Sequence, residues 1–211
     1  MKTKVIKDDD YSYAVEVLRS GGIVSIPNET VYALACNGLD AAAVASIYEV
    51  KGRPAIEPLS LLVADIKVAE TACAGIPKPA RLLAEAFWPG KLTLVLPRRD
   101  TVPHIVTAGG NTVAIRCPEH PRAVQFLRLA GIPLAAAPAY LSDAHIPKSA
   151  DEVLVYFNGK INCIIDCERC KPGSESTIVS LSSHPYKILR QGVLPEEKIR
   201  HVLSLIGESL E

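Results

Sequence analysis

The chain has 211 residues, of which 48% are apolar, and its 23 lysines and arginines balance 23 aspartates and glutamates. This length predicts one large domain or a small pair, with enough apolar residues for a sizeable core. The formal net charge of zero argues against a protein held to nucleic acid mainly by bulk positive charge, although a local basic groove is compatible with it.

Apolar spacing and capping signals predict helices and strands that alternate along the chain. Helices are expected at residues 11–19, 40–50, 79–87, 121–130 and 195–206, with Asp40 as an N-terminal cap and Gly131 as a stop signal. Strands are expected from apolar runs at residues 23–26, 59–63, 92–96, 112–116, 134–137, 161–166, 177–181 and 186–189. About seven strands and five or six helices in mixed order predict an α/β fold, in which helices cover a twisted sheet.

The first ten residues lack the apolar core of a secretory signal, and no apolar run is long enough to span a bilayer. We therefore expect a cytoplasmic protein with no membrane partner. Its six cysteines should then be reduced thiols.

Three of these cysteines, Cys163, Cys167 and Cys170, have a spacing that can hold an iron–sulfur cluster. Cys163 lies in an apolar run, which favours a buried strand, and too little chain follows to enclose a cluster. Cys167 and Cys170 could instead form half of a zinc site with His184, although no second ligand pair lies nearby in the sequence. We assign no metal ligand to the predicted site, and the sequence leaves metal binding by these cysteines open.

Two polar segments at the ends of predicted elements could bind a small molecule. Asn28 and Thr30 come directly after a strand, where they could recognise a ligand or only cap the next turn. Lys51-Gly52-Arg53 follows a helix and combines a mobile charge, a glycine that lets a ligand approach, and a bidentate fork. This triplet could bind a phosphate or carboxylate group, or its positive charges could only stabilise the C-terminal end of the helix dipole.

Two further segments carry charges or hydroxyl groups at strand ends. Arg116 ends an apolar strand, where either an anionic ligand or a buried carboxylate could serve as the partner that its charge needs. Hydroxyl groups at Ser174 to Thr177 open a strand, and Arg190 ends the next one; such groups can bind phosphate, and they are also common at sheet edges. The sequence has no Walker loop or dinucleotide glycine signature, so we expect catalysis by positioning and electrostatics.

Seven segments with a consistent order and spacing span nearly the whole chain: GGIVSIPNETVY (21–32), IYEVKGRP (47–54), FWPGKLTLVL (87–96), VAIRCPEH (113–120), PLAA (133–136), ESTIV (175–179) and ILRQG (188–192). In these segments the chain resembles the YrdC/Sua5 family. The best-known members make threonylcarbamoyl-AMP from L-threonine, bicarbonate and ATP and release pyrophosphate, for the threonylcarbamoyladenosine modification of tRNA. The resemblance implies a nucleotidyltransferase with one twisted mixed α/β domain over residues 1–211 and a concave basic cleft.

The resemblance also implies the roles of individual residues and the partners. Lys51 and Arg53 would be the catalytic cations that hold the phosphates and the amino-acid carboxylate. ATP would be a substrate accompanied by Mg²⁺, and tRNA or a tRNA-modifying protein would be a further partner. The implied substrate-binding residues are Asn28, Glu29, Thr30, Tyr32, Arg116, Tyr140, Ser142, Ser176 and Arg190.

Two motifs depart from the family pattern. Where the family has P-T-E-T-x-Y-G-L-G, this chain has Asn28 in place of the first threonine and alanines in place of both glycines. Its S-A-N reads Pro138-Ala139-Tyr140, and Pro138 has neither a hydroxyl nor a backbone N–H. The alternative function is therefore a diverged paralogue that binds a different nucleotide, a carbamoylated compound or RNA, and a third is a partner-binding protein.

Overall fold

The computed structural model describes residues 2–29, 31–52, 54–141, 145–167, 169–170 and 175–211. The strands in these ranges are β1 (Lys4–Ile6), β2 (Val24–Ile26), β3 (Ala33–Asn37), β4 (Ser60–Leu62), β5 (Leu92–Pro97), β6 (Thr112–Arg116), β7 (Leu134–Pro138), β8 (Cys163–Ile165), β9 (Thr177–Ser180) and β10 (Lys187–Arg190). The helices are α1 (Ser12–Arg19), α2 (Ala41–Lys51), α3 (Ile66–Glu70), α4 (Lys78–Phe87), the 3-10 helix η1 (His104–Thr107), α5 (Pro121–Ala130), α6 (Ala150–Phe157) and α7 (Glu196–Ser204).

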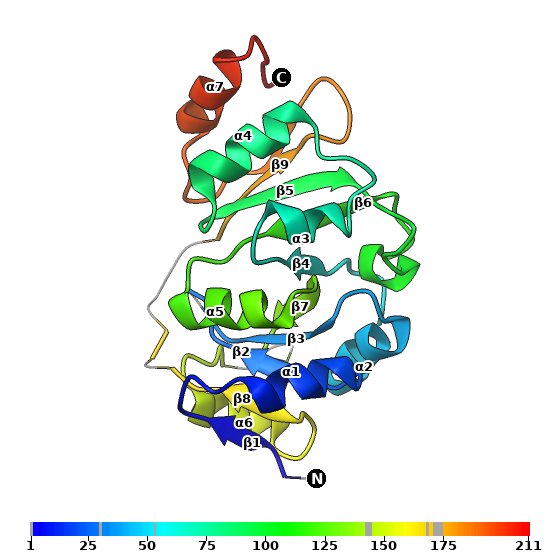
Figure 1. Ribbon diagram of the computed structural model, residues 1–211, viewed down its shortest axis with the longest axis vertical. Coiled ribbons are helices and arrows are strands. Elements are labelled where there is room, and N and C mark those ends of the chain that lie inside the picture. Colours follow the sequence, from blue (N-terminus) through cyan, green and yellow to red (C-terminus); the bar gives the residue numbers. More distant parts are fainter. Residues whose placement is uncertain (1, 30, 53, 142–144, 168, 171–174) are drawn as a thin grey trace.

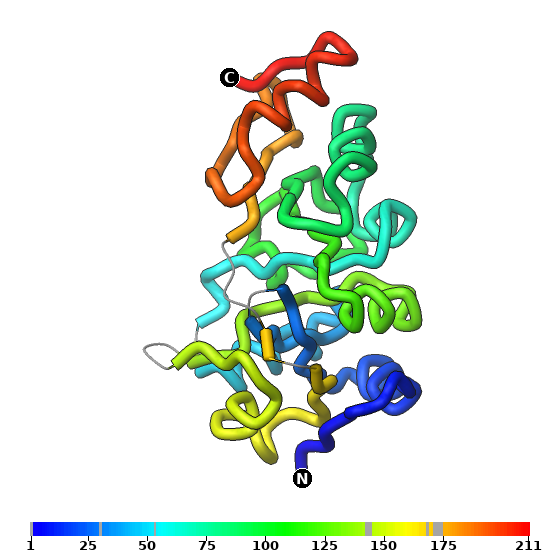
Figure 2. Tube along the Cα trace, turned by 90° about the vertical axis from the view of Figure 1, so that its left-hand side faces the viewer, coloured from blue at the N-terminus to red at the C-terminus, as the bar shows by residue number. Residues whose placement is uncertain are grey.

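Within the described ranges the strands form one ten-stranded sheet, in the order β1-β8-β2-β3-β7-β4-β6-β5-β9-β10. Parallel pairs such as β4–β6 alternate with antiparallel pairs such as β5–β6, so the sheet is mixed, as predicted. The strands stack along the long axis of the molecule (Figure 1), and the two chain ends lie at opposite ends of it (Figure 2). No helix in the described ranges is both long and apolar enough to cross a membrane.

The five predicted helices are present, and local capping explains two of their boundaries. The side chain of Asp40 accepts hydrogen bonds from the backbone N–H groups of Ala42 and Ala43 at the start of α2. Gly131 ends α5 in the left-handed conformation, with φ of 66°, which glycine adopts without steric cost.

The predicted number of about seven strands was too low, and the helices α3 and α6 were not predicted. β3 consists of Ala-Leu-Ala-Cys-Asn, whose small residues have little strand preference, and it is a strand because β2 and β7 pair with it on both sides. α6 has a capping-box signature that could have revealed it, since Ser149 accepts a hydrogen bond from the backbone N–H of Glu152.

Side chains that alternate along the strands separate into two apolar clusters, one on each face of the sheet. Ala33 and Leu62 belong to the cluster with α1 and α5, while their neighbours Leu34 and Leu61 belong to the cluster with α2, α4, α6 and α7. On the face of α1 and α5, the strand register aligns Leu62, Arg116, Thr93, Ile178 and Arg190 in one row across β4, β6, β5, β9 and β10. On these strands, the face of the sheet that carries α1 and α5 therefore presents polar as well as apolar side chains.

Candidate functional site

A hollow of about 390 Å³ lies over the middle of the sheet, on the face that carries α1 and α5. Its walls include the small side chains of Ala33 and Ala136, which leave space above the strands. Its polar lining comes from residues Asn28, Ser60, Thr93, Arg116, Tyr140, Glu175, Ser176 and Arg190. The hollow therefore combines an open strand surface with hydrogen-bonding groups from segments far apart in the sequence.

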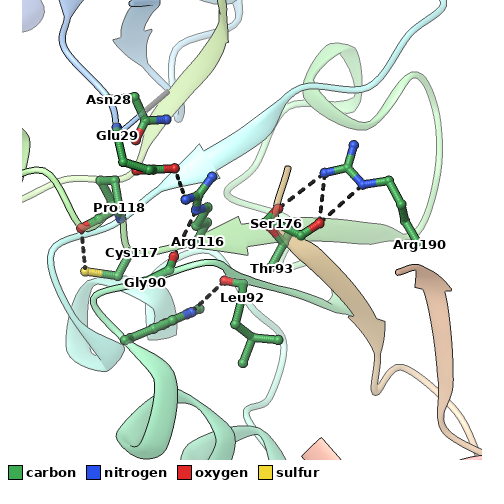
Figure 3. Close-up of polar contacts among 11 residues, drawn as sticks. Asn28, Glu29, Gly90, Leu92, Thr93, Arg116, Cys117, Pro118, Ser176 and Arg190 are labelled. Carbon is green, nitrogen blue, oxygen red and sulfur yellow. Dashed lines mark hydrogen bonds and ion pairs between the residues drawn. The ribbon is translucent and has the colours of Figure 1, made fainter. Parts of the chain in front are cut away.

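Arg116 is held at the side of the hollow by two contacts. Its guanidinium forms an ion pair with Glu29, and its Nε donates a hydrogen bond to the carbonyl oxygen of Gly90 at 3.1 Å (Figure 3). The side chains of Arg116 and Glu29 are 12% and 11% exposed. Of the two partners that the sequence left open for Arg116, the structure therefore contains the buried carboxylate.

Glu29 has a second carboxylate oxygen that remains available. Its Oε2 is buried and has no hydrogen-bond partner among the described residues. A buried oxygen of this kind has a high free energy unless a donor reaches it. An ammonium or hydroxyl group bound in the hollow could supply that donor.

Arg190 and Ser176 form the opposite side of the hollow. Nη2 of Arg190 donates to the carbonyl oxygen and to Oγ of Ser176 at 3.0 and 3.3 Å, and Ser176 Oγ lies 2.8 Å from Oγ1 of Thr93 (Figure 3). Nη1 of Arg190 also lies 3.1 Å from Glu175, whose side chain is largely exposed. Because an exposed pair is weak, an anion could replace Glu175 beside Arg190 at little cost.

Lys51 contacts the backbone of two residues that line the hollow. It ends α2 and is buried, with 8% of its surface exposed. Its Nζ donates to the backbone carbonyl oxygens of Pro138 and Tyr140 and lies 5.1 Å from the centre of the Tyr140 ring. Lys51 therefore binds the segment in which Pro138-Ala139-Tyr140 replaces the family's S-A-N. The contacts are to backbone carbonyl oxygens, which any residue at these positions would supply.

The structure brings most of the predicted site residues together. The predicted residues that line the hollow are Asn28, Arg116, Tyr140, Ser176 and Arg190, and Glu29 adjoins it through Arg116. Thr30, Arg53 and Ser142 lie outside the described residues. The expectation of a basic cleft needs refinement, because both arginines of the lining have a glutamate partner.

Tyr32 occupies a different place from the one its predicted role suggests. Its side chain is fully buried, and its hydroxyl lies 3.2 Å from Sγ of Cys167 and accepts a hydrogen bond from the Cys167 backbone N–H at 3.1 Å. Cys167 also lies beside Cys170 and His120. Sequence reasoning did not place these residues beside the site, since they follow Tyr32 by about half the chain or more.

The cysteines do not form the cluster that their spacing could have made. Cys163 is buried in β8, as predicted. His184, which was considered as a zinc ligand, stacks on Tyr186 and lies 3.9 Å from Glu208, beside the opposite end of the sheet. Within the described ranges, no group of three His, Cys, Asp or Glu side chains has an arrangement that could hold a metal ion.

Three polar lining residues were missed by the sequence interpretation: Ser60, Thr93 and Glu175. For Ser60 and Thr93 a signal exists, because each is a polar residue in a predicted apolar strand. Thr93 is buried, and a buried hydroxyl group needs a partner such as Ser176. Alternation within β5 places Thr93 on the face opposite to Leu92 and Leu94.

Comparisons with known proteins identify the family of this chain. The Sua5/YciO/YrdC family model, described as "Telomere recombination", matches residues 16–192. The threonylcarbamoyl-AMP synthase of Pyrococcus abyssi is 44% identical over 193 residues, which are 92% of this chain and 57% of that protein. The threonylcarbamoyl-AMP synthase of Bacillus subtilis is 40% identical over 200 residues, which are 94% of this chain and 58% of that protein.

Solved structures show the same similarity. The crystal structure of P. abyssi Sua5 complexed with L-threonine has a TM-score of 0.88 and 41% identity, and the match covers 100% of this chain and 62% of that one. The structure of E. coli YciO, at 24% identity and a TM-score of 0.75, shares the fold. The chain spans less than two thirds of the length of the P. abyssi and B. subtilis relatives.

Proposed function

Because the chain belongs to the Sua5/YciO/YrdC family, we propose that it is a threonylcarbamoyl-AMP synthase. In this reaction L-threonine and bicarbonate form a carbamate, whose oxygen attacks the α-phosphorus of ATP. The products are threonylcarbamoyl adenylate, pyrophosphate and water. The observation that carries the proposal is the hollow with two arginines, in a chain 41% identical to one crystallised with L-threonine.

The two sides of the hollow suit different parts of the substrates. Arg190 and Ser176 offer a guanidinium and a hydroxyl to the phosphates of ATP. The buried Oε2 of Glu29 would accept a hydrogen bond from the amino or hydroxyl group of L-threonine, and the ion pair with Arg116 holds this carboxylate in place. The residues on the two sides of the hollow would together position the carbamate oxygen in line with the α-phosphorus.

Lys51 and Arg53 are proposed as the cations nearest the reacting groups. Lys51 would also hold residues 138–140 in place, because it already donates to two of their carbonyl oxygens. This arrangement supports activity although Pro138 and Tyr140 differ from the family pattern, because backbone carbonyl oxygens are present whatever side chains these positions carry. Tyr140 adds a ring that lines the hollow and on which an adenine base could stack.

Mg²⁺ would enter this site as part of the MgATP substrate. On the side proposed for the phosphates, Glu175 pairs with Arg190, and on the other side Glu29 pairs with Arg116. Mg²⁺ commonly binds through substrate phosphates and one or two carboxylates. When bound, it would neutralise charge on the phosphates that leave as pyrophosphate.

We also propose that residues 1–211 form one domain, because a single sheet contains strands from both ends of the chain. The cytoplasm is the proposed location, since none of the six cysteines, all described, is in a disulfide. The product would pass to an enzyme that transfers the threonylcarbamoyl group to tRNA.

The test is an assay of pyrophosphate release with the purified chain, MgATP, bicarbonate and L-threonine. We expect release that requires all three substrates and that falls when L-threonine is omitted. Arg190→Ala should reduce it by about tenfold or more, because a charge-assisted contact to phosphate is lost. Lys187→Ala is the matched control on the same strand, since Lys187 pairs only with the exposed Glu211 among the ion pairs described.

The same assay distinguishes the proposed synthase from the alternative, a diverged paralogue that binds a different nucleotide, a carbamoylated compound or RNA. A diverged paralogue would release no pyrophosphate under these conditions and would not bind ATP in a calorimeter. Release that is independent of bicarbonate would also contradict the proposed reaction.

A further inference from the structure

Cys167 and Cys170 form a pair of thiols beside the segment that precedes β3. The two side chains lie beside each other, and Cys167 also lies beside His120 and 3.2 Å from the hydroxyl of Tyr32. The backbone N–H of Asn28 lies beside Cys170. The proposed function does not use either sulfur atom.

Exposure distinguishes Cys167 from the other cysteines. Cys36, Cys73, Cys117 and Cys163 are at most 1% exposed, and Cys170 is 5% exposed. Cys167 is partly exposed. A small reagent from solvent would therefore meet Cys167 first, with Cys170 directly behind it.

The surroundings of the pair also favour reaction at Cys167. The hydrogen bond from the Cys170 thiol, followed by those of His120 and Tyr32, holds the pKa of Cys167 well below that of an ordinary thiol. The same hydrogen bond and burial raise the pKa of Cys170. Burial raises the pKa of Cys117 to about 11 and that of Cys36, Cys73 and Cys163 to about 12, so these four sulfurs stay protonated.

We propose that Cys167 and Cys170 are a site of reversible oxidation by hydroperoxides, at which Cys167 is the attacking thiolate and Cys170 the resolving thiol. The Cys167 sulfur attacks one oxygen of hydrogen peroxide, the O–O bond breaks, and a sulfenic acid and hydroxide form. The Cys170 sulfur then attacks the Cys167 sulfur, a disulfide forms, and water leaves with the hydroxyl group and a proton. Overall, two thiols and one peroxide give one disulfide and two waters, and a dithiol reductant reverses the change.

Oxidation would change the binding segment, an effect that rests on the proposed function. The disulfide removes the negative charge from Cys167 and the S–H donor of Cys170, which alters the contacts to Tyr32 and Asn28. Asn28 lines the hollow, and Glu29 next to it pairs with Arg116. We expect the oxidised chain to release pyrophosphate more slowly, by about tenfold, since displacing reacting groups by about 1 Å can lower rates this much or more.

The test treats the reduced, chelator-washed chain with hydrogen peroxide, blocks remaining thiols by alkylation and maps the peptides by mass. We expect a peptide linking Cys167 to Cys170 that has lost two hydrogen atoms, and its disappearance after dithiothreitol. Cys170→Ser should give no disulfide and should accumulate a Cys167 sulfenic acid that dimedone traps. Cys73→Ala is the matched control, and both its disulfide formation and its basal activity should be unchanged.

Three outcomes would overturn the inference: equal reaction at the buried cysteines, absence of the Cys167–Cys170 peptide in the folded chain, or stoichiometric zinc bound by the pair before chelation. Thermal unfolding of each variant shows whether it is folded when treated. Failure of the proposed function is distinguishable. A disulfide that forms in a chain with no pyrophosphate release leaves the oxidation site intact, whereas full activity in the reduced chain without a disulfide contradicts only this inference.

Discussion

Glu29 forms an ion pair with Arg116, a residue of β6 that lies far along the chain, and both side chains are nearly nine-tenths buried. The pair joins the segment after β2 to the row of side chains that faces the hollow. It neutralises a guanidinium that would otherwise be isolated at the end of an apolar strand. The hollow therefore contains a fixed carboxylate and a fixed cation side by side.

Glu29→Ala should lower the free energy of unfolding by about 3 kcal/mol, because removal of one partner leaves a buried charge uncompensated. Urea unfolding at constant pH measures this change. Glu70→Ala is the control, since Glu70 pairs with Arg81 at the surface and its removal should cost less than about 1 kcal/mol. Equal losses in the two variants would show that Arg116 does not depend on Glu29.

Lys51→Met should destabilise the chain by about 1–3 kcal/mol and weaken ATP binding, because the carbonyl oxygens of Pro138 and Tyr140 lose a charged donor. Lys51→Arg should restore little of either property, since a planar fork cannot replace the compact ammonium group. Unfolding in urea and calorimetry with ATP measure the two effects. Lys78→Met, at an exposed position of α4, should change neither.

Gly192→Ala should abolish most of the pyrophosphate release. A Cβ atom at Gly192 would lie 2.4 Å from both the carbonyl oxygen of Glu175 and the carbonyl carbon of Ser176, so the backbone that carries Ser176 would have to move. Gly75→Ala is the matched control, because nothing lies within 4 Å of its Cβ position. A Gly192→Ala chain with normal activity would place Ser176 outside the site.

Ser25→Ala should stabilise the chain by up to about 1 kcal/mol, which corresponds to about 2–4 °C in the melting temperature. Ser25 is fully buried in β2, and its Oγ has no hydrogen-bond partner in the part of the chain that the structure describes. Differential scanning calorimetry measures the shift. Thr3→Val should do the opposite, because the buried hydroxyl of Thr3 donates to the carbonyl oxygen of Ile161 at 2.7 Å.

Alkylation of Cys167 by iodoacetamide should depend only weakly on pH between pH 8 and pH 6. A pKa below the usual range keeps Cys167 as a thiolate as the pH falls. An ordinary thiol, with a pKa of about 8.5, reacts about tenfold more slowly for each pH unit by which the pH falls below its pKa. Peptide mass spectrometry gives the rates. Cys170→Ala removes the strongest lowering hydrogen bond and should steepen the dependence; an unchanged slope would assign the low pKa to another cause.

Local features of the sequence predict the segments whose structure depends on near neighbours. Asp40 caps α2 and Gly131 ends α5, because a cap or a left-handed residue acts within one helical turn. Arg116 at the end of an apolar strand predicts a partner for its charge, since burial of an unpaired guanidinium is too costly. The motif order likewise predicts the family and five of the eight polar residues that line the hollow.

Contacts between distant segments are decided only when the chain is folded. Arg116 and Ser176 lie far apart in sequence, and they line one hollow because β6, β5 and β9 are neighbours in the sheet. β3 is a strand because two neighbours supply its hydrogen bonds, and Tyr32 meets Cys167 because β8 pairs beside β2. Hydrophobic burial and sheet pairing act on the whole chain at once, so the local pattern does not identify a partner that lies 87 or 135 residues away.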